Sequence, residues 1–73
     1  MEYLLVTFDE DRGVIINSAP GAWKTNQVLQ LEAGTYVVAL ELPANFTPPG
    51  IWLVLANTTV LSPDEIAFTK IQP

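Results

Sequence analysis

The sequence predicts an all-β fold: a small antiparallel β-sandwich of six to seven short strands. Val, Ile and Thr supply 19 of the 73 residues, and these residues favour strands because their branched side chains fit a pleated surface. Gly, Pro, Asn and Asp recur at short intervals and leave runs of about 5 to 8 residues between them, the usual length of a strand. At this size we expect residues 1–73 to form a single domain.

The first two apolar runs are residues 3–8 and 13–17. The polar segment 9–13 between them predicts that the two runs form a hairpin. A second turn is predicted at residues 17–21, where Pro20-Gly21 is a strong break in regular structure.

Acidic residues in the first turn partly resemble a calcium-binding loop, because Asp9, Glu10 and Asp11 precede Gly13. Such a loop also needs a third ligand before the glycine and a later bidentate Glu, and both are missing. We therefore expect no metal site, but a solvated turn in which Arg12 offsets repulsion between the carboxylates.

Residues 27–32 and 35–42 alternate between inward and outward positions, as half-buried strands do. In the first run Leu29 and Leu31 share a face. The two-residue link Ala33-Gly34 predicts a tight hairpin turn between the runs, since Gly adopts positive φ readily. The inward face of the second run is expected to carry Tyr36, Val38, Leu40 and Leu42.

The C-terminal third contains a loop and two further strands, at residues 51–57 and 66–71. Residues 43–50 hold three prolines and a glycine, so no regular structure is expected there, and Phe46 is predicted to anchor this Pro-rich loop. The segment Ser62-Pro63-Asp64-Glu65 has the spacing of a helix capping box. Because strand-like sequence follows at once, we expect at most one short 3₁₀ turn near Ser62–Glu65.

The composition excludes several classes of function. There is no Cys and no His, which removes disulfides, thiolate or imidazole metal sites and the common nucleophile–base pairs. Nothing in the sequence brings Glu32, Glu41 and Glu65 together, and no nucleophile or oxyanion motif accompanies them. We expect that the protein is not an enzyme, has no catalytic residues and uses no cofactor.

Charge and hydropathy limit the partners. The net charge is −5, and the only basic residues, Arg12, Lys24 and Lys70, are far apart in the sequence, so no nucleic-acid binding is expected. The apolar runs are much shorter than the about 20 residues of a spanning helix, and the first lacks the basic residues of a signal peptide. We therefore predict no membrane insertion, and a cytoplasmic location if the chain is complete or a cell-surface one if it belongs to a larger protein.

Several strands lack the polar face that a half-buried strand should have. Ile15 lies between two apolar neighbours, Val37 and Ala39 add apolar residues opposite an already apolar row, and the run containing Trp52 and Val54 is apolar throughout. Either the Pro-rich loop covers the outer face, or a protein partner does. Small domains often gain stability by association, so we expect contact with a second copy or a neighbouring domain through an apolar strand face or an open edge.

Four segments in a row carry a family resemblance: Ile15-Ile16-Asn17, Gly21 through Lys24-Thr25, Leu29-Gln30-Leu31, and Gly34 through Leu40 with Tyr36. In this order they resemble the PEGA domain family, over about 30 residues. The chain departs from the family pattern where Asn26 follows Thr25 in place of proline and where the preceding turn is longer. The resemblance implies a prealbumin-like β-sandwich that serves as a non-catalytic interaction module in a larger protein.

Two tryptophans remain to be assigned. Trp23 lies in a polar loop and could stack on a sugar or a peptide, but we expect it to fold back onto the end of the sandwich, and we expect Trp52 to belong to the core. The predicted function is a non-enzymatic structural or protein-interaction module. The alternative is a carbohydrate- or small-ligand-binding module centred on Trp23. The candidate interaction residues are Trp23, Val37, Ala39, Trp52 and Val54.

Overall fold

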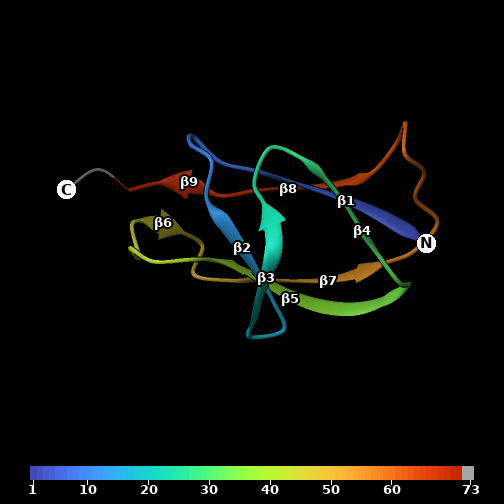
Figure 1. The fold of residues 1–73 in the computed structure, drawn as a ribbon, viewed down its shortest axis with the longest axis horizontal. Helices are drawn as coiled ribbons and strands as arrows, with labels where there is room; N and C mark the ends of the chain where they lie inside the picture. The colour runs from blue at the N-terminus through green and yellow to red at the C-terminus, as the bar shows by residue number, and fades with distance from the viewer. Residues whose placement is uncertain (72–73) are drawn as a thin grey trace.

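The computed structural model describes residues 1–71 and confirms the predicted all-β sandwich. Within these residues there are no helices and nine strands, so the prediction of six to seven strands is wrong: residues 19–24 and 46–47 also form strands, and the predicted strand 66–71 is divided between two. A three-stranded sheet, ordered β4-β1-β8, packs against a four-stranded sheet, ordered β3-β2-β5-β7, and β6 and β9 form a two-stranded ladder (Figure 1). The strands are β1 (Glu2–Thr7), β2 (Gly13–Ile16), β3 (Ala19–Lys24), β4 (Val28–Leu31), β5 (Gly34–Leu40), β6 (Phe46–Thr47), β7 (Ile51–Leu55), β8 (Asp64–Ala67) and β9 (Thr69–Lys70).

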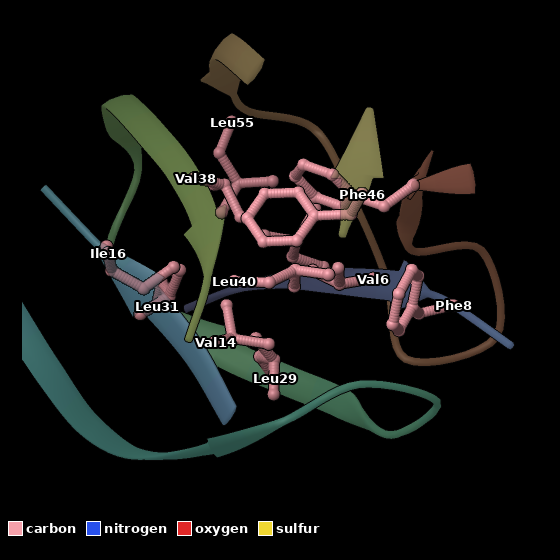
Figure 2. Close-up of a cluster of buried hydrophobic side chains, with 12 residues drawn as sticks. Val6, Phe8, Val14, Ile16, Leu29, Leu31, Val38, Leu40, Phe46 and Leu55 are labelled. Atoms are coloured by element: carbon pink, nitrogen blue, oxygen red, sulfur yellow. The ribbon is translucent and has the colours of Figure 1, made fainter. Parts of the chain in front are cut away.

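The core lies between the two larger sheets, and alternate residues of β1, β2, β4, β5 and β7 point into it (Figure 2). The predicted alternation is confirmed in β4 and β5, where Leu29, Leu31, Val38 and Leu40 are buried. Leu42 is an exception, because β5 ends at Leu40 and the Leu42 side chain is exposed. The buried apolar residues are Leu4, Val6, Phe8, Val14, Ile16, Leu29, Leu31, Val38, Leu40, Phe46, Leu55 and Phe68.

Neither predicted hairpin forms. β1 pairs with β4 and β8 rather than with β2, and β5 pairs with β2 and β7 rather than with β4. The turn-forming residues 9–12 and 32–33 instead carry the chain from one sheet to the other. Turn residues mark where a strand stops, but they do not determine whether the next strand returns beside it or crosses the sandwich.

The prediction that the sheets are purely antiparallel is also wrong. β1 and β8 run parallel, with Leu4 opposite Asp64 and Val6 opposite Ile66. This pairing joins the two ends of the chain, and no local sequence signal reports on such a long-range contact.

The predicted turn at residues 17–21 is shorter than expected. Only Asn17 and Ser18 form it, with φ values of 51° and 66°, and positive φ at both central residues is typical of a type I′ hairpin turn. Ile16 pairs with Ala19, and residues 19–24 continue as β3. Pro20 is tolerated there because β3 is an edge strand, where one side of the backbone needs no hydrogen-bond partner.

The capping-box segment forms no 3₁₀ turn within the described chain. Ser62 pairs with Thr59 through two backbone hydrogen bonds of 3.1 and 3.3 Å, and β8 begins at Asp64. Val60 and Leu61 therefore lie at the tip of a tight turn. A capping box stabilises a helix only when helix-forming residues follow it, and here strand-forming residues follow.

Phe46 is confirmed as the anchor of the Pro-rich loop. Its ring is buried and makes edge-to-face contacts with Phe8 and Phe68, at centroid distances of 6.3 and 5.6 Å. The short β6–β9 ladder, with Phe46 opposite Lys70, holds the loop at this end of the sandwich (Figure 1).

The expectation that Arg12 is solvated is wrong, because its side chain is only 8% exposed. The guanidinium lies over the Phe8 ring, 5.1 Å from the ring centroid, an arrangement that favours a cation. Its nitrogens donate hydrogen bonds to the carbonyls of Glu41 (3.1 Å) and Pro43 (2.9 Å), to Asn45 Oδ1 (3.1 Å) and to Glu10 Oε2 (3.1 Å). Sequence reasoning missed this because a lone Arg in an acidic turn is usually solvated.

Thr25 stabilises the same region through hydrogen bonds to the backbone of residues 10 and 12. It is fully buried, and its Oγ1 accepts a hydrogen bond from the Arg12 backbone N–H (2.9 Å) and donates one to the Glu10 carbonyl (2.8 Å). Asn26 Oδ1 accepts a hydrogen bond from the Phe8 N–H (3.2 Å). The segment after β3 is thereby fixed to the crossing between β1 and β2.

Replacing Arg12 should strongly destabilise the fold. Arg12→Ala leaves two carbonyls without their donor, and we expect the free energy of unfolding to fall by about 3 kcal/mol, from a total of about 4–10 kcal/mol for a chain of this size. Arg12→Lys should lower the free energy of unfolding by less, because the ammonium group keeps the positive charge. It should still lower it, because one ammonium group cannot reach all four acceptors. Urea unfolding followed by circular dichroism measures both. Lys24→Ala is the matched control, since Lys24 is exposed; an equal loss in this variant would contradict the role of Arg12.

Acid should destabilise the fold partly through Glu10. Hydrogen bonds from Lys70 Nζ (2.7 Å) and then from Arg12 lower the pKa of the Glu10 carboxyl from its ordinary value of 4.5. A carboxyl whose pKa is lower in the folded state stabilises the fold above the unfolded-state pKa, and this stabilisation is lost as the pH falls through the folded-state pKa. Urea unfolding from pH 7 to pH 3 should therefore show a smaller decrease for Glu10→Gln than for the unmodified chain. An identical pH dependence would show that Glu10 contributes nothing.

Candidate functional site

The outer face of β2, β5 and β7 in the four-stranded sheet is the candidate site, and it consists of Ile15, Thr35, Val37, Ala39, Trp52 and Val54. On the edge strand β3 the same side of the sheet carries Lys24, which lies opposite Gly13. Directly opposite residues in a ladder share a face. The register places Val37 opposite Trp52, Thr35 opposite Val54 and Ile15 opposite Ala39. The face therefore runs unbroken across β2, β5 and β7, and none of its six residues is charged.

Four residues of this outer face are open to solvent: Thr35, Val37, Trp52 and Val54. Val37 is 47% exposed, Trp52 67% and Val54 57%, while Ile15 and Ala39 are partly covered. Of the two sequence explanations, cover by the Pro-rich loop is wrong, because Phe46 draws that loop to the end of the sandwich. The four sequence candidates Val37, Ala39, Trp52 and Val54 are thus brought together on one surface.

The expectation that Trp52 belongs to the core is also wrong. In β7 the residues that face the core are Ile51, Leu53 and Leu55, and Trp52 and Val54 point the other way. All five residues are apolar, so the sequence contains no alternation from which the inward face could be chosen. The sequence alone could not show that the large side chain of Trp52 lies on the outer side.

The other sheet has a different outer face. Its central strand β1 presents Tyr3, Leu5 and Thr7, all partly buried, and β8 adds Glu65. Val28 on β4 is 45% exposed, but it lies on the same strand face as Gln30. Polar and apolar groups are thus mixed on this side, as is usual for a solvated sheet. The shortage of polar residues is confined to the four-stranded sheet.

Trp23 does not join the outer face. It lies on the edge strand β3, is partly buried and packs against the core, which confirms that it folds back onto the sandwich. A side chain at Gly21 would collide with the indole ring, so the glycine makes room for it. No cavity is found at Trp23 or elsewhere in residues 1–71.

The acidic candidates do not converge. Glu10 is hydrogen-bonded to Arg12 and Lys70, and Asn26 Nδ2 donates a weak hydrogen bond to Asp11 Oδ1 (3.4 Å). No group of three acidic side chains able to hold a metal ion occurs in the part of the chain that the structure describes. Glu2 instead accepts two hydrogen bonds from Thr58, at 2.8 and 2.7 Å, which lower the pKa of its carboxyl.

Residues 1–71 form no helix of the length and apolar character that crossing a membrane requires.

Comparison with known proteins adds no relative: no family model matches the chain, and neither a curated protein nor a solved structure matches it. The resemblance to PEGA domains therefore stays a prediction.

Substitution of the two tryptophans should affect stability differently: replacing Trp23 should destabilise the fold more than replacing Trp52. Trp23→Ala removes a ring that packs against the core, and we expect a loss of about 2–3 kcal/mol in the free energy of unfolding. Trp52→Ala should change it by less than about 1 kcal/mol, since most of that ring is in water. Urea unfolding at low micromolar concentration, followed by far-ultraviolet circular dichroism, measures both values. A larger loss for Trp52→Ala would contradict the outward position of its ring.

Proposed function

We propose that the protein is a non-enzymatic interaction module that binds a protein partner, a second copy or a neighbouring domain, through the outer face of its four-stranded sheet. The observation that carries this proposal is the exposure of Val37, Trp52 and Val54 on one uncharged surface. Contiguous apolar patches on soluble proteins mark contact sites, because leaving them in water forgoes about 25 cal/mol for each Å² that a partner would bury.

The contrast between the sheets supports this choice of surface. A chain that only needed to be soluble would place polar residues on both outer faces. Here one face is mixed and the other is apolar, although the strands of both sheets contribute buried residues to the core. The six residues of the outer face are uncharged, and most of them are β-branched or aromatic. This composition is typical of the centre of a protein interface, where charged residues are depleted.

The size of the outer face limits the contact it can make alone. Three strands spaced about 4.8 Å apart, each about five residues long at 3.3 Å per residue, have a projected area of about 240 Å². A stable complex buries about 800 Å² on each partner. The face alone therefore suits a weak contact, and a stable one would include a further part of the sheet.

The carbohydrate-binding alternative centred on Trp23 has less support. A platform for a sugar ring needs an open aromatic face, and Trp23 packs against the core. We therefore expect no glycan binding that depends on Trp23, and we assign the effect of Trp23→Ala to stability.

A charge placed on the outer face should abolish association. We expect the wild-type chain to sediment above 8.0 kDa at micromolar concentration, and Val37→Lys to weaken this association at least about tenfold, because a partner would have to desolvate the ammonium group.

Val28→Lys is the matched control for this experiment. Val28 and Val37 are the same residue type, both lie on strands, and their exposures are 45% and 47%, but they belong to opposite sheets. Val28→Lys should leave the sedimentation unchanged. A wild-type chain that stays at 8.0 kDa up to its solubility limit, or equal effects of the two variants, would contradict self-association through this face.

A further inference from the structure

The two main sheets have four edge strands, and three of them carry features that discourage further pairing. β3 contains Pro20 and Lys24 and lies beside an irregularity between Gly13 and Ile15. β8 is short and carries Asp64 and Glu65, and β4 has only four residues. Proline, charge, irregular register and shortness are the usual ways in which proteins protect an edge.

β7 has none of these features. Its five residues, Ile51 to Leu55, include no charge, no proline and no glycine. Within the described chain, the backbone groups of β7 bond only to β5. In an antiparallel ladder alternate residues point their N–H and C=O groups away from the partner strand, so one side of β7 presents unpaired donors and acceptors next to Trp52 and Val54.

We propose that two copies of the chain pair through β7, antiparallel and about a two-fold axis at Leu53, so that their four-stranded sheets join into one sheet of eight strands. This inference rests on the proposed function and names its partner as a second copy. The pairing also adds to the contact area, which is too small on the outer face alone. The apolar faces of the two copies become continuous, and backbone hydrogen bonds form between the strands.

The register follows from the sequence of β7. A two-fold axis at Leu53 places Ile51 opposite Leu55 of the second copy and Trp52 opposite its Val54. An aromatic residue beside a β-branched one is a favourable cross-strand pair, and the chain already uses it where Val37 lies opposite Trp52. Each Trp52 ring would then lie between two valines. On the inner side, the row of Ile51, Leu53 and Leu55 would continue into the same row of the second copy.

Charge favours this strand over the other edges. Each copy carries a net charge of −5, so two copies repel one another at low ionic strength. β7 itself is uncharged, and no salt bridge would form across the pair. Salt screens the general repulsion without weakening the contact, so association should become stronger, not weaker, when sodium chloride is raised from 0.05 to 0.5 M.

Engineered cysteines test the register, since the chain has no Cys of its own. In the proposed pair the Cα atoms of Trp52 and of Val54 in the second copy are about 4.5–5.5 Å apart, within the range that a disulfide spans. Oxidising a mixture of Trp52→Cys and Val54→Cys chains should therefore give the mixed disulfide about tenfold faster than either variant couples with itself, because the diagonal separations are about 7–8 Å.

Two further variants separate this pairing from other contacts. Val37→Cys lies on the same outer face, but the two copies of it would be about 16 Å apart, across three strand spacings and a two-residue offset along the strand, and it should couple slowly. Leu61→Cys, at a position 92% exposed on a loop tip, measures random collision. Circular dichroism of each variant establishes that it is folded.

The outcomes distinguish this inference from the proposed function. If the chain self-associates but Val37→Cys couples with itself faster than the mixed pair forms, the two faces stack on each other, and the β7 pairing is overturned while the proposed function stands. If the wild-type chain stays at 8.0 kDa and no variant couples faster than Leu61→Cys, self-association through either route is overturned. Association that weakens with salt would also overturn the β7 pairing.

Discussion

The buried guanidinium of Arg12 connects parts of the chain that no strand ladder joins. The link between β1 and β2 crosses from one sheet to the other, and the segment after β5 leaves the sheet near the same point. Arg12 satisfies carbonyls in that segment and donates a hydrogen bond to Glu10, which in turn accepts one from Lys70 of β9. Because a buried carbonyl without a donor is costly, this cation stabilises the path of the Pro-rich segment as it leaves β5.

The Pro-rich segment leaves the outer face of the four-stranded sheet uncovered. Phe46 draws the Pro-rich loop to the end of the sandwich, where it packs on Phe8 and Phe68. The apolar residues of β5 and β7 then have no cover from their own chain. A sandwich of two small sheets needs only one apolar face from each strand, so a second apolar face adds nothing to the core. We propose that it serves for contact with another protein, and the edge of β7 lies directly beside it.

The parts of the structure that sequence analysis predicted well depend on local periodicity. The inward positions of Leu29, Leu31, Val38 and Leu40 followed from alternation within single strands, and Phe46 was recognised as an apolar residue isolated in a Pro-rich loop. The parts it predicted wrongly depend on partners distant in sequence. The outward position of Trp52 depends on which side of β7 meets the core, and the burial of Arg12 depends on carbonyls about thirty residues further along the chain.

The sequence by itself determined the fold class, most inward-facing positions and the presence of more apolar faces than one core requires. These follow from side-chain shape and a two-residue period, which act within each strand. Only the tertiary structure decided which strands pair, that β1 and β8 lie parallel, and that the surplus apolar residues gather on one sheet beside an open edge. Such features arise from contacts between distant segments, and turn residues of the same kind can either return a strand to its neighbour or send it across the sandwich.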